Sequence, residues 1–472
     1  MNISIRSYLS DLLTLTRQNI YLVGGSVRDL LIGKEDIKDI DLLIPSGAED
    51  VARAFADKID GSFFFLDIER KSTRIVKNMA MGLIQFDFTS MQGADLAADL
   101  RRRDFSINAM ALNLREYLRS QSLENCIDLF QGKNDVINRL VRVTHQDVLN
   151  EDPLRLLRAV RFAVTLGFTI EETTAKYIRE RSYLIAMPSP ERVRDELFLI
   201  MSERGAAQYL GLIDSLGLLM PLFPELESLR RFTPGRYQGH DVLTHSIRTA
   251  GYLDSVLDDL TRISPEHART VISHLEESVE HLLRRKAALR FACLLHDVAK
   301  PETFTETGGH IRFHGHDVLG AEKAASVCSR FRMSRDSEEL IAKVIKQHMR
   351  LFTLSNAGEP GKNALHRYCR DMGSALPESL LLAQADARAT YEIMAKEEFS
   401  NTEELMGAVL DYYYTKFLKA EAKPLVNGQD LIDCGLEPGP RFGKILDEIK
   451  ERQASGLLKD RQEAIEYLKR MK

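Results

Sequence analysis

Two aspartates that stand one residue apart in an apolar strand place the strongest constraint on how this chain folds. In the segment YLVGGSVRDLLIGKEDIKDIDLLI (21–44), YLV is typical of a strand, and SVRDLLIG indicates a helix with Ser26 as its N-cap and Gly33 as its end. Asp39 and Asp41 follow in the strand DIDLLI. Because side chains alternate between the two faces of a strand, both carboxylates point the same way, and they repel each other unless a cation lies between them. The segment therefore predicts a metal site.

A third carboxylate is expected beside this pair. The run EDVARAFADKI predicts a helix closed by Gly61, and FFFLD, TRIVKN and LIQFDFT predict successive strands. In the last of these, Phe86 and Phe88 would face the core, which leaves Asp87 on the opposite face with Gln85. We therefore expect Asp87 on a neighbouring strand, as a possible third ligand.

After Ser90 the strand signals almost vanish, and the remainder predicts helices joined by polar turns. One helix is expected to begin at Pro190, with Ser189 as its cap, and a break is expected near 230–240. The predicted layout is a small head that contains strands, followed by a long helical body, so the fold class is α+β.

Bulk properties exclude several classes of protein. The chain has 472 residues, which is too long for one compact core, so two or more domains are expected. A net charge of −5 argues against a general polyanion binder but allows a local basic groove. The five cysteines are far apart, and no apolar run approaches the length of a membrane span. These features predict a cytoplasmic protein without a membrane segment.

The turn before the first helix has the composition of a phosphate-binding site. Gly24 and Gly25 allow backbone amides to approach a phosphate, and a helix N-terminus favours anions. Arg28 could reach the same phosphates. Carboxylate oxygens with open positions suit Mg²⁺, which also binds substrate phosphates. The combination indicates in-line attack of a hydroxyl on an α-phosphate at a metal site.

Three motifs in this order and spacing resemble a known family. They are LVGGSVRDLLIG with DIDLLI, DLRRRDFSINAMAL (99–112) and EDPLRLLRAVRFA (151–163). The chain resembles the class II tRNA nucleotidyltransferases and bacterial poly(A) polymerases of the DNA polymerase β superfamily over about its first 240 residues. The resemblance implies a polymerase-β-type head, followed by a helical neck, body and tail. It also implies Mg²⁺-dependent, template-independent nucleotide addition to the 3′ end of tRNA.

The resemblance assigns roles to particular residues. The metal-binding pair would be Asp39 and Asp41, and Asp87, from its position on the neighbouring strand, is the third catalytic candidate. The nucleotide-binding positions would be Gly24, Gly25, Ser26, Arg28, Arg102, Arg103, Asp104, Asn108, Asp152, Arg155, Arg158 and Arg161. Among these, Asp152 and Arg155 would read the incoming base, because a carboxylate accepts hydrogen bonds and a guanidinium donates a rigid fork.

The short stretch TSMQGADLAADL bears on which nucleotide is added. Family members that add the full CCA triplet usually carry a longer flexible loop here, so the resemblance favours CC addition from CTP. The chain also lacks the Gly-Arg-Arg-Phe-type signature of bacterial poly(A) polymerases; the corresponding stretch is GSFFFLDIERKSTRIV. Full CCA addition from CTP and ATP, A addition and poly(A) synthesis remain alternatives. The tRNA would be bound through its acceptor and T arms by basic residues, with candidates at Lys176, Arg179, Arg181, Arg192, Arg194 and Lys444.

A second metal site is expected in the helical body. Six residues match the pattern of the HD domain, an all-helical metal-dependent phosphohydrolase module: His245, His296, Asp297, His316, His348 and Asp386. Imidazole and carboxylate ligands suit Mn, Fe, Co or Ni better than Mg²⁺. A different class of function is also open, namely an HD phosphohydrolase whose head only binds nucleotide, as is a non-catalytic RNA-binding protein. The oligomeric state is not predicted.

Together these observations predict four domains. Residues 1–145 would form the nucleotidyltransferase head, 146–235 a helical neck that binds nucleotide and RNA, 236–395 the HD domain, and 396–472 a helical tail.

Overall fold

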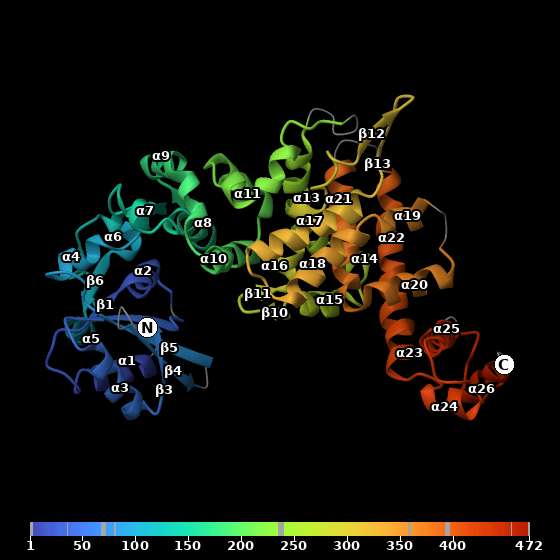
Figure 1. Cartoon of the computed structure of the whole chain (residues 1–472). Helices are drawn as coiled ribbons and strands as arrows, with labels where there is room; N and C mark the ends of the chain where they lie inside the picture. The colour runs from blue at the N-terminus through green and yellow to red at the C-terminus, as the bar shows by residue number, and fades with distance from the viewer. Residues whose placement is uncertain are drawn as a thin grey trace. The chain divides into compact units, whose positions relative to one another are not determined.

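The computed structural model describes residues 3–34, 36–67, 72–79, 82–234, 240–356, 360–391, 397–454 and 456–470 (Figure 1). The chain divides into two compact units. The first comprises Met1–Pro188 and Leu216–Pro221, and the second comprises Ser189–Ser215 and Leu222–Lys472. The predicted α+β class is confirmed, with the main sheet in the first unit and helices dominating the second. The four-domain division stays a prediction.

The first unit is built on a seven-stranded sheet with the strand order β3-β4-β5-β2-β1-β6-β7. The strands are β1 (Tyr21–Val23), β2 (Asp39–Ile44), β3 (Ser62–Asp67), β4 (Ser72–Met79), β5 (Gly82–Ser90), β6 (Met110–Asn113) and β7 (Ile127–Asp128). Strands β2 and β5 pair in parallel, and the other neighbours pair antiparallel. The strands expected between Gly61 and Ser90 are therefore confirmed.

The two faces of this sheet differ sharply in burial. Helix α3 (Ala48–Ile59) covers one face, where Phe55 packs against Phe86 with ring centroids 5.2 Å apart and against Phe88 at 5.7 Å. On the opposite face, Asp87 is only partly buried, and Asp39 is exposed. The alternation along β5 thus separates a packed core from an open surface that carries carboxylates.

Helix α2 (Gly24–Ile32) begins earlier than expected. Its N-cap is Val23, so the assignment of Ser26 to the cap is wrong, and Ser26 lies buried within the first turns. Gly33 does end the helix, in the left-handed conformation at φ +82°. Helix α3 ends at Asp60, which itself adopts φ +52°, rather than at Gly61.

The expectation that strands vanish after Ser90 is wrong. Strand β6 lies inside the main sheet between β1 and β7, with Met110 and Ala111 fully buried. Because β6 is short and its side chains are buried with no polar alternation, its sequence MALN cannot be distinguished from a helix segment by periodicity. Short pairs follow: β8 (Leu140–Val141) with β9 (Thr169–Ile170), β10 (Ser278–Glu280) with β11 (Leu283–Arg284), and β12 (Phe304–Thr307) with β13 (His310–Phe313).

The other α-helices of the first unit include those that carry parts of the second and third motifs. They are α1 (Ile3–Leu12), α4 (Leu96–Arg101), α5 (Leu114–Ser120), α6 (Gly132–Ile137), α7 (Val148–Glu151), α8 (Arg155–Leu166) and α9 (Glu172–Arg181). Helix α4 is capped by Asp95, whose side chain accepts from the Ala98 amide at 2.8 Å.

The second unit is a helical body. Helix α10 (Pro190–Ser202) begins at Pro190 after Ser189, as expected. The further helices are α11 (Ala206–Ser215), α13 (Val242–Asp258), α14 (Leu260–Ile263), α15 (Ala268–Leu275), α16 (Arg285–Leu295), α17 (His316–Arg330), α18 (Arg335–Gln347), α19 (Arg350–Asn356), α20 (Lys362–Met372), α21 (Leu376–Tyr391), α22 (Glu397–Tyr412) and α23 (Leu418–Ala422). Helix α12 (Leu219–Leu222) spans the boundary of the two units. Across the described ranges, no helix is long and apolar enough to cross a membrane.

The last helices form a small core of their own. They are α24 (Gly428–Asp433), α25 (Arg441–Ala454) and α26 (Arg461–Lys469). Leu431, Ile449 and Leu468 are buried in this core. A capping box between Asn427 and Asp430 begins α24.

Candidate active sites

Three carboxylates meet on the open face of the head sheet. The parallel register of β2 and β5 sets Asp41 opposite Asp87 and Asp39 opposite Gln85. Residues that face each other across paired strands point to the same side of the sheet. The structure therefore brings Asp39, Asp41 and Asp87 together, although Asp87 is 46 positions away from Asp41 in the numbering.

The carboxylates are close enough to perturb one another. Burial, reinforced by the charge of Asp87, raises the pKa of Asp41 to about 6. Although the Asp39 residue as a whole is exposed, partial desolvation of its carboxylate raises its pKa; Arg74 opposes this effect, and Asp87 and Asp29 add to it. A cluster of carboxylates that resists ionisation in this way fits a hard divalent cation, because the cation removes the repulsion. The residues present are thus suited to Mg²⁺.

Asp87 is already engaged by a cation of the protein. Arg74 donates to both of its oxygens, from Nε to Oδ1 at 2.8 Å and from Nη2 to Oδ2 at 2.8 Å. This bidentate pair fixes the carboxylate beside Asp41. The role of Asp87 as a third metal ligand remains a prediction, since it would have to share its oxygens with Arg74.

Ser26 ties helix α2 to the aspartate pair. Its buried hydroxyl donates to the Asp39 carbonyl at 3.1 Å and accepts from the Asp41 amide at 2.7 Å. The single hydroxyl proton is therefore committed to strand β2, so any contact of Ser26 with phosphate would have to come from its backbone amide. This positioning role was not predicted, because no pattern in the sequence indicates which group a hydroxyl will bond to.

The glycines allow the start of α2 to approach the carboxylate. Gly24 has φ +63°, and a Cβ atom there would lie 2.9 Å from Asp41 Oδ2 and 3.2 Å from Arg103 Nη1. The backbone amides of Gly25 and Ser26 face the Asp41 carboxylate and lower its pKa, against the larger opposite effect of burial. The Asp41 carboxylate therefore lies at the N-terminus of α2, where the helix dipole favours a negative charge.

A buried polar chain joins the three motifs. Arg28 Nη1 donates to Asn108 Oδ1 at 2.8 Å, and Asn108 Nδ2 donates to Asp104 Oδ1 at 3.1 Å. Arg158 completes the chain by donating to Asp104 Oδ2 from Nε at 3.0 Å and from Nη2 at 2.6 Å. Burial alone would raise the pKa of Asp104, but Arg158 and the hydrogen bonds from Asn108 and the Phe105 amide outweigh it and hold the pKa below its usual value.

Phe162 gathers the arginines of the first and third motifs, and the sequence analysis did not single it out. The guanidinium carbons of Arg161, Arg158 and Arg28 lie 4.1, 5.3 and 5.4 Å from the centre of its ring. Its own ring packs against Phe105 with centroids 5.6 Å apart. Aromatic support of this kind orients guanidinium groups.

The predicted base-reading residues lie at the start of α8. Arg155 donates to the carbonyls of Arg102 at 2.8 Å and Val148 at 3.0 Å. Asp152 caps α7 and accepts from the Leu154 amide at 3.3 Å. Backbone contacts thus hold the Arg155 guanidinium and the Asp152 carboxylate in place. Fixed groups of this kind suit the predicted recognition of a base.

The two arginines predicted to bind nucleotide in the second motif, Arg102 and Arg103, differ in their surroundings. Arg103 donates to Asp99 Oδ2 from Nη2 at 3.2 Å and acts electrostatically on Asp41. The Arg102 side chain is exposed. Arg103 is therefore the member of this pair that lies closest to the carboxylates.

The structure also brings together the six residues expected in the helical body. They form two triads, His245 with His296 and Asp386, and Asp297 with His316 and His348. Asp297 lies between the triads: its Oδ2 is 3.2 Å from His296 Nε2, and its Oδ1 is 3.8 Å from His316 Nε2. The Asp297 carboxylate is therefore within reach of both triads and would hold a metal ion together with residues of either one.

Backbone carbonyls orient the imidazoles. Nδ1 of His296 lies 2.8 Å from the Cys293 carbonyl, and Nδ1 of His316 lies 2.7 Å from the Phe313 carbonyl. His348 repeats the pattern at 2.6 Å with Ile345. A proton on Nδ1 leaves Nε2 as the electron-pair donor that a metal requires, and outer hydrogen bonds of this kind are typical of metal-binding histidines.

The electrostatics of this cluster also fit a cation. Burial, with the neighbouring imidazoles of His296 and His316, lowers the pKa of His348 to about 4, so His348 is neutral at neutral pH. Burial would lower the pKa of His296 as well, but Asp297 and Asp386 outweigh it and raise that pKa. Within the described residues, the buried Nε2 of His296 makes no well-aligned hydrogen bond, although Asp297 Oδ2 lies 3.2 Å from it. Four imidazoles and two carboxylates are a donor set suited to a transition metal.

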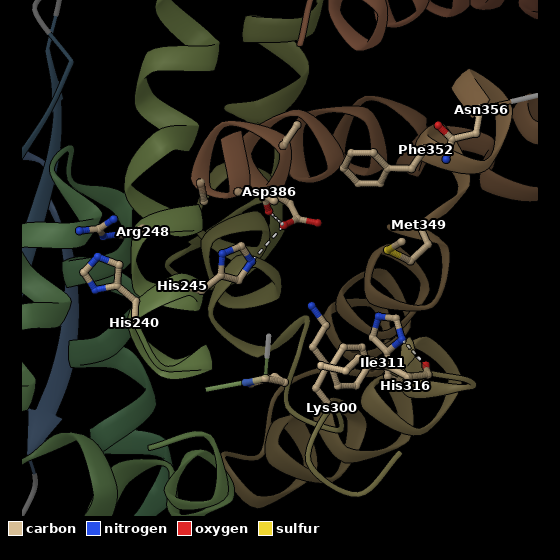
Figure 2. Close-up of a pocket in the computed structure, with 15 residues that line it drawn as sticks. His240, His245, Arg248, Lys300, Ile311, His316, Met349, Phe352, Asn356 and Asp386 are labelled. Atoms are coloured by element: carbon tan, nitrogen blue, oxygen red, sulfur yellow. Dashed lines mark hydrogen bonds and ion pairs between the residues drawn. The ribbon is translucent and has the colours of Figure 1, made fainter. Parts of the chain in front are cut away.

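A cavity of about 330 Å³ is lined by three of these residues, His245, His316 and Asp386. Figure 2 shows His245 and Asp386 pointing toward each other, 3.0 Å apart, with Lys300 and His316 on another wall of the cavity. Lys300 Nζ donates to Asp297 Oδ2 at 2.6 Å. A lysine beside a metal-binding cluster can neutralise a phosphate.

Family models match the chain in the order of its elements. The Poly A polymerase head domain matches residues 20–142, the RNA- and SrmB-binding site of polymerase A matches 167–229, and the HD domain matches 242–391. A model for domain 2 of tRNA nucleotidyltransferases matches 317–468.

Curated relatives match along nearly the whole chain. An A-adding tRNA nucleotidyltransferase from Deinococcus radiodurans is 32% identical over 95% of this chain and 94% of its own length. A CC-adding tRNA nucleotidyltransferase from Thermus thermophilus is 30% identical over 96% of this chain and 94% of its own. Among solved structures, a Thermotoga maritima CCA-adding enzyme in complex with tRNA is similar in fold, with a TM-score of 0.64, 21% identity, and coverage of 99% of this chain and 95% of that one.

Proposed function

The chain belongs to the tRNA nucleotidyltransferase family, and from that premise we propose that it adds two cytidines from CTP to the 3′ end of tRNA, without a nucleic acid template. The single observation that carries nucleotide addition is the cluster of Asp39, Asp41 and Asp87 at the N-terminus of α2. It unites carboxylates suited to a metal with neighbouring arginines suited to a triphosphate.

In the proposed reaction, the 3′-hydroxyl oxygen of the tRNA forms a bond to the α-phosphorus of CTP, and the bond to the β-phosphate oxygen breaks. Pyrophosphate leaves. Asp39 and Asp41 would hold Mg²⁺, which supplies charge neutralisation and alignment for the in-line displacement. Arg28 and Arg103 lie beside the start of α2, where they can bind the triphosphate.

The protein itself would select the base. A cytosine presents an amino donor and two acceptors along its pairing edge, and Asp152 with Arg155 offers the complementary acceptor and donors. Their backbone anchors support a fixed geometry that does not have to be built on binding. Asp104, through Arg158 and Asn108, would keep the three motifs in register.

Restriction to CC addition is supported by a short connection. Only residues 91–95 separate the end of β5 at Ser90 from the start of α4 at Leu96, where full CCA-adding enzymes usually carry a longer loop. A pocket without such a loop has less freedom to switch from C to A. The Thermus relative named for CC addition supports the same assignment.

One observation favours a second candidate. The Deinococcus relative is named for A addition and shows 32% identity, slightly above the Thermus protein. A addition predicts that a tRNA ending in CC is the preferred primer and ATP the preferred nucleotide.

Primer and nucleotide combinations separate these activities. Transcripts ending before the CCA, after C or after CC are incubated with CTP, ATP or both, and products are resolved by mass. We expect two added cytidines on the first transcript, one on the second, and no adenosine on the third. Adenosine added only to the CC-ended transcript would establish A addition, and three added nucleotides would establish full CCA synthesis.

For the second unit we propose a metal-dependent phosphohydrolase activity, based on the six-residue cluster beside the cavity. Mn, Fe, Co or Ni would suit the site. The HD match supports the assignment, and a 2′,3′-cyclic phosphate at an RNA 3′ end is a substrate to test. The test is metal analysis of the purified protein together with hydrolysis of such an end. His296→Ala should lose both the metal and the hydrolysis, and a variant that keeps full hydrolysis would exclude this cluster as the site.

A further inference from the structure

One row of side chains crosses four neighbouring strands on the open face of the head sheet. The strand registers pair Phe64 with Arg74, Arg74 with Asp87, and Asp87 with Asp41. Directly paired residues point to the same face, so the row runs from the carboxylates to an aromatic ring at the edge strand. The row lies entirely within the first unit.

This row is accessible, in contrast to the residues beside it. Phe64 is 52% exposed, whereas Ile75 and Phe86, next in sequence to Arg74 and Asp87, are fully buried. Leu83, which pairs with Asn78 on the same face, is 56% exposed. An exposed aromatic ring beside a polar site offers a face on which a base can stack.

The neighbour of Phe64 on the other face has a structural partner. Phe65 packs against Phe63 with ring centroids 5.3 Å apart, and the Arg53 guanidinium carbon lies 5.3 Å from the Phe65 ring. Phe65 is nevertheless 42% exposed, close to the value for Phe64. Phe64 and Phe65 are therefore similar in residue type and exposure but lie on opposite faces of the sheet, so Phe65 can serve as a control for Phe64.

The order of chemical groups in the row corresponds to the order in an RNA 3′ end. The terminal hydroxyl has to reach the carboxylate site, a phosphate follows, and the bases lie beside the backbone. Neighbouring strands are about 4.8 Å apart, so Arg74 lies two strands and Phe64 three strands from Asp41, roughly 10 and 14 Å. These distances are within reach of the last two nucleotides of a single-stranded end.

We propose that Phe64 and Arg74 form a primer platform, which binds the 3′-terminal nucleotides of the RNA during nucleotide addition. Phe64 stacks on a base, and Arg74 pairs with the adjoining phosphate. Stacking on an aromatic ring accepts any base, which suits an end whose terminal base changes as nucleotides are added. This inference rests on the proposed function and deepens it, because it names where the primer lies.

The first test compares Phe64→Ala with the matched control Phe65→Ala. Binding of a tRNA transcript that lacks CCA is measured directly by fluorescence anisotropy, and KM is measured for primer and for CTP. Phe64→Ala should weaken primer binding about tenfold, the range expected for loss of one stacked base, with KM for CTP unchanged. Phe64→Trp should restore binding, and Phe65→Ala should resemble the wild type. Equal primer affinity of Phe64→Ala and wild type would overturn the proposal.

A modified primer separates stacking from a general effect on the fold. With an abasic 3′-terminal nucleotide, the wild type should lose about tenfold in affinity, whereas Phe64→Ala should lose no more. An equal abasic penalty in both proteins would mean that Phe64 does not stack on that base.

Salt dependence tests the second member of the platform. Arg74→Gln should reduce the slope of log Kd against log salt concentration by about 0.7, the value for one single-strand phosphate. An unchanged slope would remove Arg74 from the platform. Failure of the proposed function is a separate outcome: it would appear as wild-type protein that adds no nucleotide, whereas the platform is scored by primer binding.

Discussion

At the scale of single residues, the head site depends on groups that hold the carboxylates rather than on the carboxylates alone. Ser26 joins the Asp39 carbonyl to the Asp41 amide, and Arg74 fixes both oxygens of Asp87. Asp104 plays the same part for the other motifs, because it is buried and receives hydrogen bonds from Asn108 and Arg158. Such groups act on geometry without touching the reacting atoms.

Asp104→Asn should destabilise the protein, because it leaves the Arg158 guanidinium without its carboxylate. Because Asp104 is buried but the Arg158 side chain is 32% exposed, the loss should be about 2 kcal/mol of unfolding free energy, below that for a fully buried pair. The pKa of Asp104 is lower in the folded protein than its usual value of 3.8. The unfolded state therefore binds the proton first as the pH falls, so the contribution is complete well above pH 4 and is lost at more acidic pH. Urea unfolding of both proteins should show a constant difference between pH 7 and pH 5.

Glu49→Gln is a control for this experiment. Glu49 pairs with Arg53 at 3.0 Å on the surface, with side chains that are 33% and 52% exposed. An exposed pair within a helix contributes less than about 1 kcal/mol. A loss as small for Asp104→Asn as for Glu49→Gln would contradict the structural role of Asp104.

At the scale of elements, the head site is the meeting of a helix start with two parallel strands. Helix α2 presents Gly24 to the Asp41 carboxylate, and β5 presents Asp87 from the neighbouring strand. The two ends of α2 are both glycines with positive φ, but their surroundings differ. Gly33 has nothing within 4 Å of the position that a Cβ atom would occupy.

Gly24→Ala and Gly33→Ala should therefore separate backbone strain from damage to the site. Each places alanine in the left-handed region, which costs about 1 kcal/mol. Only Gly24→Ala also brings a Cβ atom to 2.9 Å from Asp41 Oδ2. We expect Gly24→Ala to lower kcat about 100-fold, the scale associated with a misplaced catalytic group, and Gly33→Ala to leave kcat unchanged. Steady-state kinetics with thermal unfolding would test this, and equal losses of kcat would refute the close-approach argument.

At the scale of the whole molecule, two candidate metal sites of different chemistry lie in different compact units. The head offers carboxylates alone, whereas the second unit offers imidazoles with two aspartates. Hard oxygen donors favour Mg²⁺, and mixed nitrogen and oxygen donors favour a transition metal. The two activities should accordingly depend on different metals.

Asp41→Ala should abolish nucleotide addition and leave hydrolysis of a cyclic phosphate unchanged, and Asp297→Ala should do the reverse. The physical reason is that each substitution removes a donor from one cluster only. Both reactions are measured on each variant, and metal content is determined after dialysis against a chelator. Loss of both activities in Asp41→Ala would show that the sites are coupled.

Local patterns in the sequence determined a large part of this description. Alternation along DIDLLI placed Asp39 and Asp41 on one face of their strand, alternation along QFDF placed Asp87 away from the core, and Gly33 marked the end of α2. The spacing of the motifs led to the family, and the order of histidines led to the second cluster. These features can be predicted from the sequence because strand alternation, helix ends and metal-ligand chemistry depend on residue type and short spacing.

Tertiary structure alone decided how distant groups meet. The parallel register of β2 with β5, the burial of β6, and the partners of Ser26, Arg74 and Phe162 all depend on contacts between segments that are far apart in the chain. The open row from Asp41 to Phe64 has the same origin, since only the order of strands sets an aromatic ring beside the acidic site. A hydroxyl, a guanidinium or an aromatic ring can interact with many kinds of group. Its neighbours in the sequence therefore do not specify which group it contacts in the folded protein. Packing selects that partner, because burial penalises every polar group that remains unsatisfied.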